Sequence, residues 1–317
     1  MTRRLATIIY NPMSGRPARR AENVQKMSRL LEGCGLDVEA RPTAGPDDAT
    51  RLAREATAGG ADIIISYGGD GTLNEVLQGM AGSQTSLAVW PGGTANVVAI
   101  DLGVPSDIAV LAEMIAAGKT RRIALGLATR VGGWESGVGD QTNPQPPTPS
   151  PQLLSRYFIM MAGIGLDASV ARKVNIKLKR RTGEFAYWVE GIRHLFTWQA
   201  EPFTVEVDGR SHESVFTLIG NGKGYGGRLM ITPGAKLEEP WFEVFILPRL
   251  ANNFAYVRAV GACISGKPET CGASLVKAKH IKANSAHEPW VEADGELIGP
   301  LPMAFEVVPN ALSLIVP

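Results

Sequence analysis

Three short glycine-containing stretches in the first third of the chain could bind phosphate. The first, Gly68-Gly69-Asp70-Gly71-Thr72, follows the isoleucine run at residues 63–65 and precedes an apolar helical pattern. Glycines where a strand meets a helix leave backbone N–H groups bare, and the start of a helix carries partial positive charge, so a phosphate is favoured there. A tight turn without a ligand is the alternative, but three glycines and an aspartate in five residues favour the phosphate site.

Two further stretches have the same design. Residues 91–96 read PGGTAN after an apolar strand pattern, and residues 11–16 read NPMSGR after the first strand pattern of the chain. We expect Thr94 to cap the helix after the PGG turn. We expect Thr72 to cap the helix after GGDGT, together with Glu75, in a T-x-x-E capping box. If the three strands belong to one parallel sheet, their ends meet in the crevice where such sheets bind ligands.

Asp294 and Glu296 are carboxylates that could move a proton. They lie in VEADGE, residues 291–296, where a D-G pair between apolar runs is typical of a hairpin turn. Because Asp208-Gly209 occurs in a similar setting, periodicity alone does not single out Asp294. What distinguishes the later turn is Glu296, a second carboxylate two residues on, since a positioned carboxylate can act as a general base.

The residues that must position these groups fall in two parts. Up to about residue 128, strand and helix patterns alternate, which predicts a parallel sheet with helices on both faces. After residue 120, short β-rich runs separated by Gly, Pro and Asp turns predict an antiparallel sandwich. These runs include residues 157–162, 305–308 and 312–316. We expect a doubly wound, Rossmann-like α/β domain over residues 1–125, an antiparallel β-sandwich domain over residues 126–303, and a C-terminal segment over residues 304–317.

Composition narrows the classes of function. A chain of 317 residues is long for one core and favours two domains. Lys plus Arg number 32 against 31 for Asp plus Glu, so no basic excess indicates a nucleic-acid partner. The three scattered cysteines fit a reducing compartment, and the four scattered histidines predict no zinc site. Since no apolar run approaches the ~18 residues of a membrane span, we expect a cytoplasmic protein with peripheral membrane contact only.

Two other glycine patterns are rejected as dinucleotide sites. Residues 163–168 and residues 222–227 both match the G-x-G-x-x-G/A fingerprint, but neither falls in a predicted β-α-β unit. The phosphate-loop sequence G-x-x-x-x-G-K-[ST] does not occur in the chain. The motifs therefore predict neither a dehydrogenase nor a P-loop enzyme.

The ordered set of motifs resembles one family. NPMSG, GGDGTLNEV, PGGTAN, AGIGLDA, NGKGYGG and DGE, spread over nearly the whole chain, are similar to the bacterial soluble lipid kinases of the diacylglycerol kinase catalytic family, relatives of sphingosine and ceramide kinases. GGDGT alone is shared with NAD kinases and 6-phosphofructokinases, whereas the ordered set is more specific. The resemblance implies an NAD kinase/diacylglycerol kinase-like fold, with an N-terminal ATP domain, a C-terminal sandwich carrying the lipid cleft, and a C-terminus that returns to the first domain.

The resemblance also implies roles for individual residues. Asp294 and Glu296 would do the proton transfer and metal-linked work, with the choice of base left open between them. Asp70 would face Mg·ATP and is a third, outside candidate for the catalytic base. The implied nucleotide-binding positions are Asn11, Pro12, Met13, Ser14, Gly15, Arg16, Thr43, Gly68, Gly69, Asp70, Gly71, Thr72, Leu73, Asn74 and Thr94. Family members hold a structural Mg²⁺ in a DDG-type stretch that here reads Glu-Glu-Pro, and the implied ligands are Glu239 and the carbonyls of Lys236 and Trp241.

We therefore expect an ATP-dependent lipid kinase that transfers the γ-phosphate to a lipid hydroxyl at the membrane surface. Diacylglycerol is the default acceptor, although sphingoid bases, ceramide and monoacylglycerol also present a primary hydroxyl beside an apolar tail. An NAD kinase-like small-molecule kinase and a catalytically degenerate lipid-binding protein are the alternatives. An apolar stripe over residues 185–195, preceded by basic residues at 173–181, is read as core or as a membrane-surface face. An edge strand could pair two copies into a homodimer.

Overall fold

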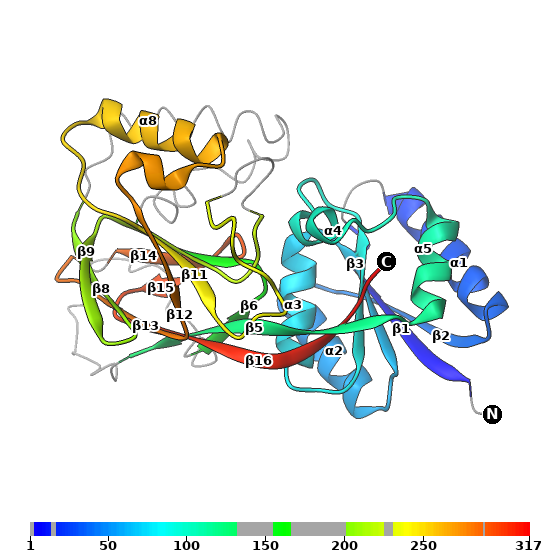
Figure 1. The fold of residues 1–317 in the computed structure, drawn as a ribbon. Coiled ribbons are helices and arrows are strands. Elements are labelled where there is room, and N and C mark those ends of the chain that lie inside the picture. Colours follow the sequence, from blue (N-terminus) through cyan, green and yellow to red (C-terminus); the bar gives the residue numbers. More distant parts are fainter. Residues whose placement is uncertain (1–2, 14–16, 132–154, 166–200, 225–230, 288) are drawn as a thin grey trace, which may run out of the picture.

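Four parallel strands form the first part of a ten-stranded sheet (Figure 1). The computed structural model describes residues 3–13, 17–131, 155–165, 201–224, 231–287 and 289–317. The four strands are β1 (Arg4–Tyr10), β2 (Leu36–Pro42), β3 (Ile63–Gly68) and β4 (Ser86–Pro91). They lie in the order β2-β1-β3-β4, and each neighbouring pair is parallel. This order places the β1, β3 and β4 ends next to one another.

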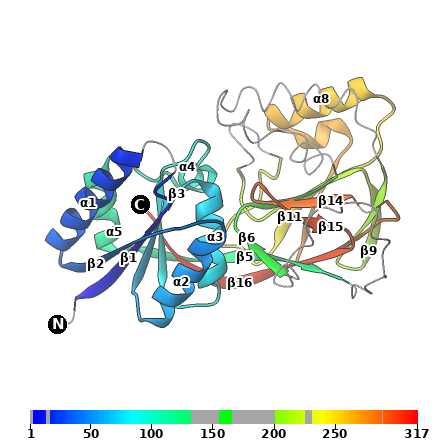
Figure 2. The ribbon, with the colours of Figure 1, turned by 180° about the vertical axis from the view of Figure 1, so that it is seen from behind.

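Helices cover both faces of these strands (Figures 1 and 2). The helices are α1 (Pro17–Gly33), α2 (Asp48–Ala58), α3 (Asp70–Met80), α4 (Val97–Leu102) and α5 (Ile108–Ala117). Side chains alternate along a strand, so Ile8 packs with α1 and α5, whereas the next residue, Ile9, packs with α2 and α3. The predicted doubly wound α/β domain is confirmed.

The second part of the chain is a sandwich of two sheets. The six-stranded sheet is antiparallel and contains β7 (Met161–Gly165), β10 (Phe216–Gly220), β11 (Phe242–Leu247), β12 (Ser274–Ala278), β14 (Trp290–Ala293) and β15 (Glu296–Pro300). Opposite it lie β5 (Thr120–Arg130), β6 (Ser155–Phe158), β8 (Phe203–Val207), β9 (Arg210–Ser214), β13 (His280–Asn284) and β16 (Met303–Ile315). Phe158, Phe242 and Phe305 are buried together in the core between them. The predicted antiparallel β-sandwich is confirmed.

Strand β16 joins the two parts into one sheet (Figure 1). Its first half pairs with β13 and β5, and its end pairs in parallel with β4 at Ser313↔Ser86 and Leu314↔Leu87. The prediction of two strands over residues 305–308 and 312–316 is wrong, because one strand continues through a register shift between Val308 and Leu312. The predicted domain boundary after residue 125 falls inside β5.

The prediction of one strand over residues 157–162 is also wrong. Strand β6 pairs with β5 in the larger sheet, whereas β7 pairs with β10 and β14 in the smaller one. The chain crosses between the two sheets at Ile159 and Met160. Their backbone N–H groups donate to the carboxylate of Asp294 rather than to a neighbouring strand.

A long apolar helix α8 (Asn253–Ile264) and a 3₁₀ turn (Pro268–Cys271) lie on the outside of the six-stranded sheet (Figure 1). Within the described residues, no helix has the length and apolar character needed to cross a bilayer. The stripe at residues 185–195 and its basic neighbours lie outside the described residues.

Candidate active site

The ends of the three strands that precede the glycine motifs lie at one edge of the sheet. Strands β1, β3 and β4 end level with one another, because Tyr10 pairs with Tyr67 and Gly68 pairs with Pro91. Gly92 N donates to Gly68 O over 2.8 Å, which continues the pairing into the turns. Thr43 lies beside the end of β1, where its N–H donates to Tyr10 O over 2.9 Å. The predicted meeting of the strand ends is confirmed for the described residues, while Ser14, Gly15 and Arg16 lie outside them.

The GGDGT and PGG turns pack directly on each other. A Cβ built on Gly69 would lie 3.3 Å from the Cα of Gly93, and a Cβ on Gly93 would collide with Gly69. A Cβ on Gly68 would collide with the side chain of Thr72. Glycine is favoured at residues 69 and 93 because the two turns meet backbone against backbone, and at residue 68 because the side chain of Thr72 occupies the space of a Cβ.

Both predicted helix caps are wrong. Helix α3 begins at Asp70 with Gly69 as N-cap, so Thr72 lies inside the first turn, and α4 begins at Val97, three residues after Thr94. The glycines let the chain enter α3 early, because they tolerate the turn without a side-chain cap. Glu75 does not reach back to the start of its own helix but accepts a hydrogen bond of 3.2 Å from Ala49 N on α2.

Asp70 connects the starts of two helices. Its Oδ1 accepts a hydrogen bond of 2.8 Å from Val97 N, the first residue of α4. A carboxylate at a helix N-terminus is stabilised by the helix dipole and satisfies an N–H that has no acceptor within the helix. Asp70 therefore fixes the GGDGT and PGG turns relative to each other.

Arg20, on α1, contacts the backbone at the starts of both glycine turns. Its guanidinium is buried and donates to Gly92 O over 2.8 Å and to Tyr67 O over 3.4 Å. It also lies 4.0 Å from the ring centre of Tyr67, which stacks on Trp90. Burial lowers the pKa of Arg20, but an arginine remains charged at neutral pH. Arg20 thus places a fixed positive charge beneath the two glycine turns.

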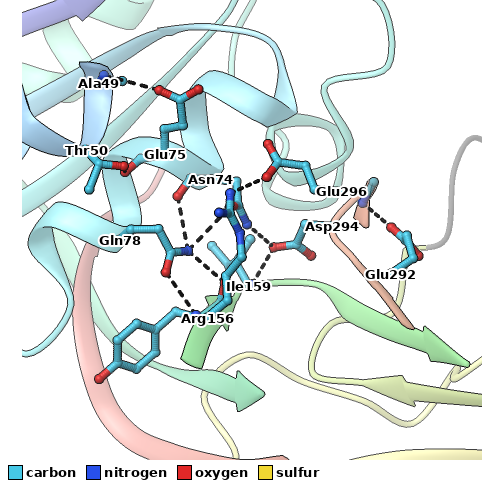
Figure 3. A network of polar contacts seen from close by, with 12 residues as sticks. Ala49, Thr50, Asn74, Glu75, Gln78, Arg156, Ile159, Glu292, Asp294 and Glu296 are labelled. Carbon is cyan, nitrogen blue, oxygen red and sulfur yellow. Dashed lines mark hydrogen bonds and ion pairs between the residues drawn. The ribbon is translucent and has the colours of Figure 1, made fainter. Parts of the chain in front are cut away.

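The DGE triplet of the second domain reaches this edge of the first domain. Asp294 and Gly295 form the turn between β14 and β15 with φ values of 47° and 88°, and Glu296 begins β15. A Cβ built on Gly71 would lie 3.6 Å from Oε1 of Glu296. The structure therefore places the Glu296 carboxylate against the first turn of α3, inside the GGDGT motif (Figure 3).

Asp294 is held by four N–H groups. Its Oδ2 accepts from Ile159 N (2.7 Å) and from Asn74 Nδ2 (3.1 Å). Its Oδ1 accepts from Met160 N (2.9 Å) and Met161 N (3.1 Å). Burial raises the pKa of Asp294, and these donors oppose that rise because they stabilise the charged form. With four donors on two oxygens, this carboxylate is an anchor between the domains.

The other D-G hairpin provides an internal comparison. Asp208 and Gly209, between β8 and β9, have φ values of 44° and 84°, close to those of Asp294 and Gly295. The Asp208 carboxylate also accepts backbone N–H groups, from Lys279 and from His280 over 3.1 Å. Asp208 is exposed, and its hairpin lies far from the glycine turns in the sheet order. In both D-G turns, the aspartate carboxylate accepts hydrogen bonds from backbone N–H groups. Only the second hairpin is followed by a carboxylate, Glu296, that lies against α3.

A polar chain joins Glu296 to α3 through Arg156 on β6 (Figure 3). Arg156 forms an ion pair with Oε2 of Glu296 and donates to Oδ1 of Asn74 from Nη2 (2.7 Å) and Nε (3.2 Å). Gln78, one turn after Asn74, pairs with the backbone of Tyr157 through both amide atoms, at 2.8 and 3.0 Å. Sequence analysis missed Arg156 and Gln78. The i+4 spacing between Asn74 and Gln78 indicates that both lie on one face of a helix, which could have drawn attention to Gln78. No sequence pattern indicates Arg156.

The pKa of Glu296 is set by opposing effects. Burial raises it, and the positive charge of Arg156 lowers it. The carboxylates of Glu75, Asp294 and Asp47 raise it further. The net direction is upward, so Glu296 takes up a proton at a higher pH than an ordinary glutamate.

The residues implied for a structural Mg²⁺ form a turn before β11. Glu239 N donates to Lys236 O over 3.0 Å, while Glu238 is paired with Arg121. Among the described residues, no three acidic, histidine or cysteine side chains gather as a metal cluster. Mg²⁺ is commonly held by one or two carboxylates and several waters. A Mg²⁺ held by Glu239 and the carbonyls of Lys236 and Trp241 stays a prediction.

Two packed glycine turns on an α/β domain, faced by a carboxylate from a β-sandwich, define a two-domain fold of the NAD kinase and diacylglycerol kinase type. The family model of the diacylglycerol kinase catalytic domain matches residues 5–128. The model of the YegS C-terminal NAD kinase beta sandwich-like domain matches residues 160–316. Together the two family models match most of the chain, which is therefore similar to a diacylglycerol kinase catalytic domain followed by its sandwich domain.

Relatives named diacylglycerol kinase match nearly the whole chain. The protein from Bacillus subtilis (strain 168) is 29% identical over 98% of this chain and 96% of its own length. The protein from Staphylococcus aureus (strain bovine RF122 / ET3-1) is 29% identical over 96% of this chain and 89% of its own. A crystal structure of a diacylglycerol kinase from Bacillus anthracis str. Sterne aligns with a TM-score of 0.75 at 25% identity, covering 98% of this chain and 96% of that one.

Proposed function

We propose that this protein transfers the γ-phosphate of ATP to the hydroxyl group of a lipid, with diacylglycerol as the first candidate. The observation that carries the proposal is the position of Glu296. A carboxylate from the second domain lies against the first turn of α3, where the GGDGT turn is built to receive phosphate. A base placed next to a phosphate site is the arrangement that phosphoryl transfer to an alcohol requires.

The donor side of the site consists of backbone. We assign the ATP phosphates to the Gly68–Gly71 turn and the start of α3, because the first N–H groups of a helix have no acceptor within it. The segment from Asn11 to Arg16, together with Thr43, Thr72 and Thr94, completes the proposed nucleotide site, whereas Leu73 and Asn74 are buried at 4% and 1% exposed. Asp70 holds the two turns together and faces the bound nucleotide. Mg²⁺ would neutralise phosphate charge there, and a second ion would sit at Lys236, Glu239 and Trp241.

Glu296 is the proposed base and Asp294 its anchor. The carboxylate of Asp294 is already engaged by four N–H donors, whereas the side chain of Glu296 is 35% exposed. As the lipid oxygen bonds to the γ-phosphorus, its proton passes to the carboxylate of Glu296. ADP leaves with the electrons of the broken bond between the γ-phosphorus and the bridging oxygen. Interactions needed only in the transition state raise kcat, so the loss of Glu296 should lower kcat more than ATP affinity.

The acceptor side is proposed to be the sandwich domain at a membrane surface. We assign ATP binding to residues 1–125 and lipid binding to residues 126–303, with residues 304–317 tying the two together through the β16–β4 pairing. Helix α8 exposes Phe254 (67%) and Ile264 (57%), with Arg258 exposed between them and no acidic residue from 253 to 264. An apolar and basic helix face of this kind suits an anionic lipid surface.

A direct assay tests the proposal. The protein is incubated with Mg²⁺ and γ-labelled ATP, with a lipid extract in one reaction and NAD in another, and the products are separated. Labelled lipid is the expected product, and labelled NAD alone would show an NAD kinase-like enzyme. If ATP and lipid both bind but no label is transferred to any lipid class, the protein is a binding protein. Sedimentation of the same sample tests the proposed pairing of edge strands into a homodimer.

A further inference from the structure

We infer that Arg156 is a positioning residue for the proposed base. It holds the Glu296 carboxylate against the GGDGT turn and links the position of that carboxylate to helix α3. This inference rests on the proposed function and adds a residue that none of the sequence motifs contains. Arg156 comes from β6, which is part of neither the GGDGTLNEV motif nor the DGE triplet. It nevertheless contacts a residue of each, namely Asn74 and Glu296.

The geometry leaves Arg156 little freedom. Its side chain is 12% exposed, and its Nε and Nη2 both donate to the same amide oxygen, Oδ1 of Asn74, at 3.2 and 2.7 Å. Asn74 is itself fixed, because it is 1% exposed and its Nδ2 donates to Asp294 over 3.1 Å. The guanidinium is planar and rigid, so two bonds to Asn74 fix the direction in which its remaining N–H groups point. Nη2 also meets Oε2 of Glu296.

The backbone around Arg156 is fixed to the same helix. Its neighbour Tyr157 exchanges two hydrogen bonds with the side-chain amide of Gln78, which lies one turn beyond Asn74 on α3. A movement of α3 would therefore carry β6, Arg156 and Glu296 with it. Since α3 starts at the GGDGT turn, the helix that receives the phosphate and the base that takes the proton are built as one unit (Figure 3).

The ion pair with Arg156 also affects the protonation of Glu296, because other charged groups lie near this carboxylate. Among the described residues, Glu75 on α3, Asp47 before α2 and Asp294 in the hairpin raise the pKa of Glu296 by their negative charge, and Arg156 lowers it by its positive charge. With Arg156 replaced by a neutral residue, three carboxylates remain unopposed, and the charged form of Glu296 is disfavoured. A lysine keeps the charge but lacks the rigid, planar fork through which Nε and Nη2 both donate to Asn74.

The test compares Arg156→Gln and Arg156→Lys with the wild-type protein, using Mg·ATP and dispersed diacylglycerol. We expect Arg156→Gln to lower kcat by roughly 10- to 100-fold, with the KM for ATP within about threefold. The acid limb of its kcat/KM profile should move to higher pH by about one unit. Arg156→Lys should restore the position of the acid limb but recover kcat only in part. Arg51→Gln, which removes an exposed arginine paired with Asp48 and Glu55 on α2, is the matched control and should change neither.

Three outcomes would overturn the inference. An unchanged acid limb in Arg156→Gln, with kcat lowered equally at every pH, would make Arg156 a structural residue only. A KM for ATP raised tenfold with kcat unchanged would make it a phosphate ligand instead. Wild-type rates in both variants would remove it from the site. Absence of lipid phosphorylation by the wild-type protein is a separate result, because it contradicts the proposed function rather than the role of Arg156.

Discussion

The side-chain amide of Asn74 lies 3.1 Å from the carboxylate of Asp294, although the two residues are 220 positions apart in the chain. Asn74 belongs to the helix that starts at the GGDGT turn, and Asp294 to the hairpin that carries Glu296. This contact joins the proposed donor side to the proposed acceptor side. It also separates the roles of the two carboxylates. Asp294, which is engaged by Asn74 and three backbone N–H groups, is the anchor, and Glu296 is the proposed base.

Asp294→Asn should destabilise the fold. An asparagine places an NH₂ group where the aspartate accepts N–H donors, so at least one donor is left without an acceptor in a partly buried site. We expect the free energy of unfolding, measured by urea denaturation, to fall by about 2–3 kcal/mol. The control is Asp208→Asn, the same turn in an exposed hairpin, with a loss below ~1 kcal/mol. Equal losses in both variants would contradict the anchoring role.

Gly93→Ala should weaken ATP binding. The added Cβ would collide with Gly69 and push the PGG turn away from the GGDGT turn. We expect the Kd for ATP, measured by calorimetry, to rise about tenfold or more, which corresponds to ~1.4 kcal/mol. Gly33→Ala is the control, since a Cβ there would meet no described atom within 4 Å. An unchanged Kd in Gly93→Ala would show that the contact between the two turns does not shape the nucleotide site.

The activity should depend on pH through Glu296. A base must be deprotonated to work, and burial raises the pKa of this carboxyl group. Activity should therefore rise with pH through a value above the ~4.3 of an ordinary glutamate. The kcat/KM profile reports this pKa for the free enzyme. A profile whose acid limb lies at or below that of a free glutamate would contradict the assignment.

Exchange of the exposed apolar residues of α8 should weaken membrane binding. In the double variant Phe254→Ser with Ile264→Ser, less apolar surface is available to enter the lipid headgroup region. We expect co-sedimentation with phosphatidylglycerol vesicles to fall several-fold, with an unchanged circular dichroism spectrum. Val110→Ser, on α5, removes an apolar side chain that is 51% exposed on the other domain and serves as the control. Equal vesicle binding by the wild-type protein, the α8 double variant and Val110→Ser would exclude α8 as the membrane contact.

The sequence predicted the parts of the site that local patterns encode. Alternating strands and helices gave the α/β domain, and β-rich runs gave the sandwich. The helix starts at Thr72 and Thr94 were wrong because capping preferences are local, whereas here glycines and the carboxylate of Asp70 set the starts of α3 and α4. The break between β6 and β7 was missed because its cause, Asp294, lies more than 130 residues away. Arg156 was missed for the same reason, since a single arginine in a strand becomes informative only when its partners are known.

The most direct test of the account is the turnover of Glu296→Gln on diacylglycerol with labelled Mg·ATP, measured beside its affinity for ATP. A glutamine keeps the shape of the side chain and removes its ability to accept the proton. We expect kcat to fall by roughly 10²–10⁴-fold, with a Kd for ATP within about threefold of the wild-type value. Turnover of Glu296→Gln close to that of the wild-type protein would contradict the assignment of Glu296 as the base that faces the phosphate turn.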